Sequence, residues 1–322
     1  MANRQALLVV NPVSGTRSKR GLASAAERRL GAAGIEVRTV MTEGPGHASE
    51  LAAEAVATGT ETVIAAGGDG TVNEIATALS HTRTALGIIP LGSGNGLART
   101  LGIPQDVDEA LGVIAAGNIE TCDRGMACGL PFYCTFGVGF DAEVSEKFAS
   151  EKRRGRITYV RSVLQEFLEY QPQPYAISVG GRVITERAFL IAACNASQYG
   201  NNAYIAPKAE LTDGLLDLVV IHEGSPLSTV KMGMDLMTGY IDRNTRIDTF
   251  KVSAATITRL KSGPVHLDGE PLSFGTNMEL TCDAGALRVY APAEREDFKP
   301  IVSPLRALFS DLRYDVKAKL RP

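Results

Sequence analysis

Three glycine-rich loops contain the residues most suited to binding a phosphorylated ligand. They are residues 11–15 (NPVSG), 67–74 (GGDGTVNE) and 92–96 (GSGNG), and each follows a short apolar run and precedes a helical pattern. Glycine allows backbone N–H groups to approach a phosphate closely, and the N-terminus of the following helix adds positive potential. The loops therefore predict a nucleotide-phosphate site.

Asp69 lies in the second of these loops. A carboxylate beside a phosphate repels it unless a divalent cation lies between them, so Asp69 predicts Mg²⁺. The alternative is that Gly-Gly-Asp-Gly is a tight turn and that Asp69 caps the next helix. Three such loops after successive strands favour the nucleotide interpretation.

Other catalytic motifs are missing from the sequence. There is no GxxxxGK[ST], GxSxG or HExxH, and the third loop reads GxGxG instead of the dinucleotide motif GxGxxG. The cysteines are odd in number and no pair has CxxC spacing, which favours buried free thiols over a metal site. Those cysteines are Cys122, Cys128, Cys134, Cys194 and Cys282.

The composition is that of a globular protein. The 322 residues carry a net charge of −3, which argues against general nucleic-acid binding, and 44% of them are hydrophobic. No apolar run approaches the roughly 20 residues of a membrane-spanning helix, and residues 11–12 (Asn-Pro) interrupt the N-terminal apolar run that an export signal needs. We expect a cytoplasmic protein without a nucleic-acid partner.

The elements that must position the loops follow two patterns. Up to about residue 120, apolar runs alternate with helical segments, which predicts a parallel sheet covered by helices, with ligands at the carboxyl ends of its strands. After about residue 125, strand patterns separated by Gly-Gly, Asp-Gly and Gly-Pro turns predict a mostly antiparallel domain. The predicted strands are 6–10, 37–41, 62–66, 85–90, 131–140, 175–179, 182–184, 188–193, 215–221, 251–260, 265–267, 278–282 and 287–290, and the helices are 23–33, 47–57, 72–79, 107–116, 157–170 and 226–240.

Six motifs together resemble the diacylglycerol kinase catalytic-domain superfamily, which includes bacterial soluble lipid kinases, sphingosine kinases and ceramide kinases. They are NPxSG at 11–15, GGDGTxNE at 67–74, PLGSGN at 90–95, GFDAEV at 139–144, TDGLLD at 212–217 and LDGEP at 267–271. GGDG alone is shared with NAD kinases and phosphofructokinases, but the complete set is specific. The resemblance implies a phosphofructokinase-like Rossmann-type α/β domain, a β-rich second domain and a cleft between them.

The resemblance also implies domain limits and residue roles. The nucleotide domain would span residues 1–124 and the lipid-kinase domain 125–285, with a return strand at 286–293 and a tail with an amphipathic helix at 294–322. Glu270 would be the catalytic base, acting with Asp69, and Asp213 would bind a metal ion with the carbonyls of Glu210 and Leu215, in a structural or regulatory role. ATP would contact Asn11, Ser14, Gly15, Thr42, Gly67, Gly68, Asp69, Gly70, Thr71, Asn73 and Ser93.

The hairpin pattern leaves the role of Glu270 open. A lipid hydroxyl needs a base to accept its proton, which a carboxylate supplies. From pattern alone, however, residues 267–270 predict an ordinary Asp-Gly hairpin. Both interpretations hold if the hairpin tip carries the base into the cleft. Asp141 could likewise contact the lipid head group or be a solvated strand end.

Two positions depart from the pattern of bacterial diacylglycerol kinases. Gly96 stands where that branch commonly has an aspartate, which leaves Asp69 and Asp123 to act in place of that carboxylate. Sphingosine kinases have a small residue at this position, so this loop is closer to theirs. Thr16 stands where a lysine often follows NPxSG. Arg17, Lys19, Arg20 or Arg99 could supply the positive charge, and we favour Arg99 because it lies one helical turn beyond Asn95.

The resemblance implies an ATP- and Mg²⁺-dependent lipid kinase that converts diacylglycerol to phosphatidic acid. Sphingoid bases or ceramide are alternative acceptors, and a soluble-metabolite kinase of the NAD kinase type or a non-catalytic binding regulator are rival functions. A lipid substrate requires peripheral membrane contact, for which the basic segment 147–161 and the tail helix 303–322 are candidates. The tail pattern equally fits docking on the protein itself or on a second subunit in a homodimer.

Overall fold

The computed structural model describes residues 4–295 apart from 16–18, 20, 151–169, 202, 226–231, 233–234, 237 and 242–243. The predicted helix 157–170, except Tyr170, lies outside the described residues. So do most of the predicted helix 226–240, residues 151–161 of the basic segment and the tail helix 303–322.

The first domain is the predicted parallel sheet covered on both faces. Its strands lie in the order β2-β1-β3-β4, and all their pairings are parallel. Successive residues of a strand point to opposite faces of the sheet. Leu7 and Val9 therefore pack with helices α2 and α3, and Leu8 and Val10 pack with helices α1 and α5 on the other face. The elements are β1 (Arg4–Val10), α1 (Leu22–Gly31), β2 (Ile35–Met41), α2 (His47–Ala57), β3 (Thr62–Gly67), α3 (Asp69–Leu79), β4 (Ala85–Pro90), α4 (Gly96–Thr100) and α5 (Val107–Ala116).

The second domain is mostly antiparallel, as predicted, and has its own apolar core. The turn Gly180-Gly181, with φ of 55° and 78°, joins its first two long strands. None of the five cysteines forms a disulfide: Cys122, Cys134 and Cys194 are buried, whereas Cys128 is exposed and Cys282 is partly buried. The elements are β6 (Leu130–Phe132), β7 (Thr135–Gly139), α6 (Phe140–Ser150), β8 (Gln173–Val179), β9 (Arg182–Cys194), β10 (Leu216–His222), β11 (Ile247–Val252), β12 (Ala254–Arg259), β13 (Gly263–Leu267) and β14 (Glu270–Phe274).

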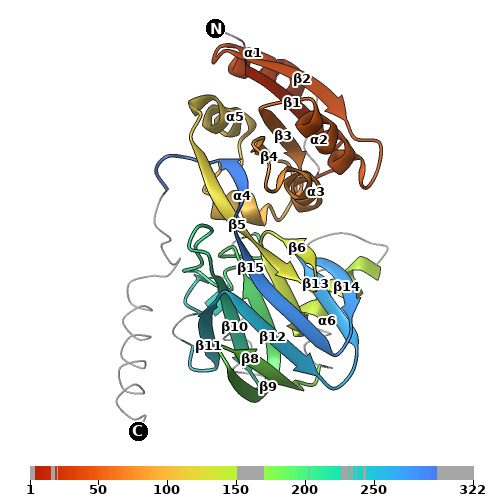
Figure 1. Cartoon of the computed structure of the whole chain (residues 1–322), viewed down its shortest axis with the longest axis vertical. Coiled ribbons are helices and arrows are strands. Elements are labelled where there is room, and N and C mark those ends of the chain that lie inside the picture. Colours follow the sequence, from red (N-terminus) through yellow and green to blue (C-terminus); the bar gives the residue numbers. More distant parts are fainter. Residues whose placement is uncertain are drawn as a thin grey trace.

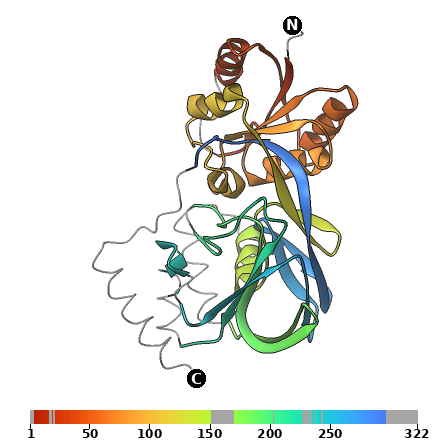
Figure 2. The same ribbon diagram turned by 60° about the vertical axis from the view of Figure 1, so that its left-hand side comes forward.

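Two long strands connect the domains. β5 (Ile119–Ala127) and β15 (Asn277–Tyr290) form an antiparallel ladder from Leu280↔Ala127 to Tyr290↔Ile119, and both run from one domain into the other (Figures 1 and 2). The end of β15 pairs with β4, and the Tyr290 hydroxyl lies 2.9 Å from Thr62 Oγ1 in the first domain's core. The strands of the two domains therefore belong to one continuous hydrogen-bonded sheet.

The second domain differs from the predicted elements in one place that matters for the site. The predicted strand 131–140 is two strands, and helix α6 begins at Phe140. Gly139 has a φ of 102°, which ends the strand, and the Asp141 carboxylate accepts a hydrogen bond from Ala142 N in the first helical turn. Asp141 is consequently a helix residue next to the sheet.

Among the described residues, none of the helices combines the length and the hydropathy needed to cross a bilayer.

Candidate active site

The three glycine loops meet at the carboxyl ends of β1, β3 and β4. Asn11 Nδ2 donates to Thr71 Oγ1 at 2.9 Å, and Leu91 N donates to Gly67 O at 2.8 Å, so each loop is tied to a neighbour. Gly15 has a φ of +56°, and a Cβ there would lie 1.9 Å from Leu91 O, so only glycine fits. The predicted phosphate-binding residues are thus gathered at one edge of the sheet.

Asp69 connects the second loop to the third. Its Oδ2 accepts from Asn95 N at 2.8 Å and its Oδ1 accepts from Gly96 N at 2.7 Å, the two amides at the start of α4. An ionised carboxylate has about four lone-pair positions, so two remain. Asp69 therefore fixes the loop geometry and retains acceptor capacity.

The remaining predicted nucleotide contacts lie around these loops. Thr42 follows β2, and its N–H donates to Val10 O at 2.9 Å. Glu74 on α3 accepts from Gly46 N at 3.0 Å, which holds the loop after Thr42 against this helix. Ser93 is exposed at the tip of the third loop.

Two of the basic residues considered from the sequence, Arg99 and Lys19, contact the glycine loops. Arg99, the expected source of positive charge, donates from Nε to Gly94 O at 3.0 Å and so supports the third loop. Lys19 donates from Nζ to Ser14 O and brings an ammonium group to the first loop. Asp123 accepts from Gly214 N at 2.7 Å and Gly285 N at 2.8 Å, so its carboxylate supports the turn at Gly214 and the bulge of the strand Asn277–Tyr290.

Glu270 lies next to the tip of the β13–β14 hairpin. Asp268 and Gly269 form a two-residue turn with φ of 50° and 86°, as in a type I′ turn, and Leu267 pairs with Glu270. The predicted hairpin is therefore present, and its first outgoing residue is the exposed carboxylate of Glu270.

Asp268 fixes the hairpin to the rest of the site. Its Oδ1 accepts from Cys134 N and Thr135 N, and its Oδ2 accepts from Tyr133 N, at 2.7–2.8 Å. The fourth donor is Asn73 Nδ2, 2.7 Å from Oδ2, which comes from α3 of the first domain. The GGDGTxNE and LDGEP motifs are therefore in direct contact, through two residues that lie 195 positions apart in the sequence.

The charge on Asp268 is disfavoured by its surroundings. Burial raises the pKa of this carboxyl to about 6, against the lowering effect of the three backbone N–H groups, and the nearby negative charge of Asp69 raises it further.

His266 also supports the hairpin, through the backbone of Gly269. Gly269 N lies 3.3 Å from His266 Nδ1, so the proton of this buried imidazole is on Nε2, which lies 3.1 Å from Asp141 Oδ2. Tyr199 OH donates to the same oxygen at 2.9 Å. Asp141 is thus joined to the hairpin through His266.

Sequence reasoning missed Asp268, His266 and Tyr199 as site residues. Two of them lie within four positions of Glu270 and flank the apolar Leu267. The available signal was His266, a polar residue in the otherwise apolar strand Gly263–Leu267, because buried polar side chains need partners. Tyr199 carried no such signal.

Close packing leaves little room for a side chain at Gly96. A Cβ at this position would lie 3.1 Å from Cys134 Sγ and 3.3 Å from Tyr199 O, so the space that a longer side chain needs is already filled. We expect Gly96→Asp to lower both the melting temperature and the activity, and Gly96→Ala to have a smaller effect on each. Thermal unfolding of the two variants tests this, and a Gly96→Asp variant with unchanged stability would contradict it.

The predicted metal ligands lie in the second domain beside a lysine. Asp213 Oδ1 accepts from Leu215 N at 3.0 Å, and Asp213 Oδ2 lies 2.6 Å from Lys251 Nζ, while Glu210 is exposed. Partial burial disfavours the charge of Lys251, but hydrogen bonds to Asp213 and Asp217 raise its pKa above the ordinary value. Within the described ranges, no group of three or more His, Cys, Asp or Glu side chains is placed to hold a metal ion.

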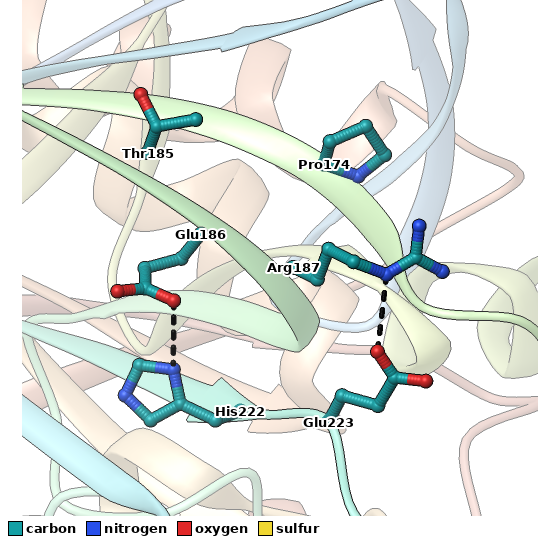
Figure 3. Close-up of a pocket in the computed structure, with 6 residues that line it drawn as sticks. All are labelled: Pro174, Thr185, Glu186, Arg187, His222 and Glu223. Atoms are coloured by element: carbon teal, nitrogen blue, oxygen red, sulfur yellow. Dashed lines mark hydrogen bonds and ion pairs between the residues drawn. The ribbon is translucent and has the colours of Figure 1, made fainter.

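A pocket of about 430 Å³ lies on the second domain, away from the loops. Figure 3 shows that its charged side chains face one another: Arg187 Nε is 3.0 Å from Glu223 Oε2, and His222 Nδ1 is 3.8 Å from Glu186 Oε2. It shares no residue with the glycine loops or with the hairpin. The pocket lining is Pro174, Thr185, Glu186, Arg187, His222 and Glu223.

Comparisons with known proteins match both domains. The diacylglycerol kinase catalytic domain matches residues 5–127, and the YegS C-terminal NAD kinase beta sandwich-like domain matches residues 134–291. A Chromohalobacter salexigens protein named "Probable lipid kinase YegS-like" is 32% identical over 270 residues, which are 82% of this chain and 86% of that protein. The chain belongs to the diacylglycerol kinase and YegS family of lipid kinases.

Other relatives support the same membership. A diacylglycerol kinase of Mycobacterium tuberculosis is 29% identical over 301 residues, which are 91% of this chain and 94% of that one. The crystal structure of a diacylglycerol kinase from Bacillus anthracis has a TM-score of 0.71 at 22% identity and covers 90% of this chain and 97% of its own, which supports the fold. As a member of this family the chain is a phosphotransferase, and the predicted family and fold class are confirmed.

Proposed function

We propose that this lipid kinase transfers the γ-phosphate of ATP to the hydroxyl of diacylglycerol and forms phosphatidic acid. The observation that carries the proposal is the hydrogen bond between Asn73 of the second glycine motif and Asp268 of the hairpin, 2.7 Å long. It supports the proposal because it brings the second glycine loop and the hairpin that carries Glu270 to one junction between the domains. Family membership supplies the reaction class.

In this proposal the glycine loops bind the triphosphate of ATP. Backbone N–H groups of residues 67–71 and the start of α3 would face the phosphates, with Asn11, Ser14, Thr42, Asn73 and Ser93 around them. The remaining lone pairs of Asp69 would hold Mg²⁺, directly or through water. When bound, Mg²⁺ neutralises charge on the β- and γ-phosphates.

Glu270 would be the general base. The lipid hydroxyl gives its proton to the Glu270 carboxylate as its oxygen forms a bond to the γ-phosphorus. The bond from the γ-phosphorus to the bridging oxygen breaks, and ADP leaves. Asp268 and His266 hold the hairpin, so Glu270 is carried by a fixed backbone.

Gly96 supports a second acceptor class, sphingoid bases or ceramide. The sphingosine kinases, which the third loop resembles, have a small residue at this position, and Gly96 is packed here against Cys134 and Tyr199. A kinase for a soluble metabolite such as NAD shares only the GGDG loop.

Access to the lipid would require peripheral contact of a cytoplasmic enzyme with a membrane. The basic segment 147–161 and the tail 303–322 are the sequence candidates for this contact. The alternative for the tail is an interface between two subunits.

Transfer of radiolabelled phosphate tests the acceptor. The enzyme is incubated with γ-labelled ATP, MgCl₂ and separate vesicles that contain diacylglycerol, sphingosine or ceramide, and with NAD in solution. We expect label in phosphatidic acid. Label in a sphingoid or ceramide phosphate would replace the proposed acceptor, while label in NAD or in no product would contradict a lipid kinase function for this chain.

A further inference from the structure

A lysine lies between two carboxylates at the position where the sequence predicts a metal ion. Lys251 Nζ is 2.6 Å from Asp213 Oδ2 and 3.0 Å from Asp217 Oδ2. Asp217 in β10 pairs directly with Lys251 in β11, so the sheet register fixes this approach. Asp213 comes from the turn before β10.

The two carboxylates need a positive charge. Asp217 is only 4% exposed and Asp213 is half-buried, so ionising both without a counter-charge is unfavourable. The ammonium group of Lys251 contacts an oxygen of each. It therefore provides the charge that a bound cation would otherwise provide.

A metal ion does not fit beside this lysine. Mg²⁺ binds carboxylate oxygens at about 2.0–2.1 Å and Ca²⁺ at about 2.3–2.6 Å. The Lys251 nitrogen lies 2.6 Å from Asp213 Oδ2, while Oδ1 accepts from Leu215 N. A cation on Asp213 would have to displace the ammonium group or lie against it, and the like charges repel.

We infer that the Lys251 ammonium is the resident cation of this site and that the second domain binds no divalent metal at Asp213. The charge that the family resemblance assigns to a metal ion is here part of the polypeptide. The stability of the β10–β11 region is then independent of the concentration of divalent cations. This inference does not depend on the acceptor or on the role of Glu270.

Thermal unfolding of the nucleotide-free enzyme, with and without millimolar MgCl₂ or CaCl₂, tests the inference. We expect an unchanged melting temperature for the wild type. Lys251→Met should melt several degrees lower, because it removes the positive charge that contacts both carboxylates, and CaCl₂ should restore much of the loss. Two control variants should have melting temperatures close to that of the wild type. Lys251→Arg keeps the positive charge, and Lys261→Met changes an exposed lysine of the same domain.

Two results would overturn the inference. One is a wild-type melting temperature that rises with either salt by a shift that Asp213→Asn abolishes. The other is Lys251→Met melting at the wild-type temperature. If Lys251→Met does not fold, CaCl₂ is titrated into the wild type and into Asp213→Asn by calorimetry. Equal heats for the two proteins support the inference. A binding heat that the wild type shows and Asp213→Asn lacks contradicts it.

Discussion

Glu270→Gln is expected to lower kcat for lipid phosphorylation by about 10²–10⁴-fold, the usual contribution of a general base. Glutamine keeps the size of the side chain but cannot accept the hydroxyl proton. The Kd for ATP should remain close to the wild-type value, because the glycine loops carry the predicted phosphate contacts. Steady-state kinetics on diacylglycerol vesicles and calorimetric titration with ATP measure the two effects separately.

Glu279→Gln is the matched control for this experiment. Glu279 is an exposed glutamate of β15 in the same domain, outside the hairpin. We expect its kcat to equal that of the wild type. Wild-type turnover in Glu270→Gln would remove Glu270 from the mechanism, and an equal loss in both variants would indicate a general effect of charge.

Asp268→Asn is expected to lower the free energy of unfolding by about 2–3 kcal/mol, because one pair of donors loses its acceptor oxygen. Four N–H groups converge on the Asp268 carboxylate, two on each oxygen. An asparagine amide would place its own donors against one pair. Urea unfolding measures the loss, and Asn73→Ala, which removes one of the four donors, should cost less.

The same carboxyl predicts a pH dependence of stability. Its folded pKa is raised from 3.8 to about 6, so the folded state binds more protons than the unfolded state between these values. The contribution of Asp268 to the free energy of unfolding is therefore largest below pH 3.8 and declines as the pH rises through about 6. The difference between wild type and Asp268→Asn should change across this range, and parallel pH profiles would contradict the raised pKa.

The first domain could be predicted from the sequence because its signals are local. The strands predicted at 85–90 and the helices at 47–57 and 107–116 match β4, α2 and α5, since buried parallel strands are continuous apolar runs and amphipathic helices have a clear period. Helix α3 begins at Asp69, three residues before the predicted start, because Asp69, Gly70 and Thr71 lack the apolar period.

The second domain was harder to predict from the sequence because its long strands change pairing partners along their length. The predicted strand 251–260 is divided between β11, which pairs with β10, and β12, which pairs with β8 and β15. The two separate predictions at 278–282 and 287–290 are one strand, β15, interrupted by a bulge. An apolar pattern does not reveal which neighbour a strand adopts.

The glycine loops could be predicted as a group, but the contacts that complete the site could not. Asn73 meets Asp268 across 195 residues, and Lys251 meets Asp213 across 38. Such pairs depend on domain packing and strand register, which a local pattern does not contain. The motifs identified the residues, and the fold determines which of them act together.

A crystal structure with a non-hydrolysable ATP analogue and Mg²⁺ tests the central claim, that the glycine loops and the hairpin form one phosphoryl-transfer site. We predict the triphosphate on the backbone amides of residues 67–71, with the γ-phosphate turned toward Glu270. A nucleotide bound elsewhere, such as in the pocket lined by Arg187 and His222, or a γ-phosphate directed away from Glu270, would contradict it.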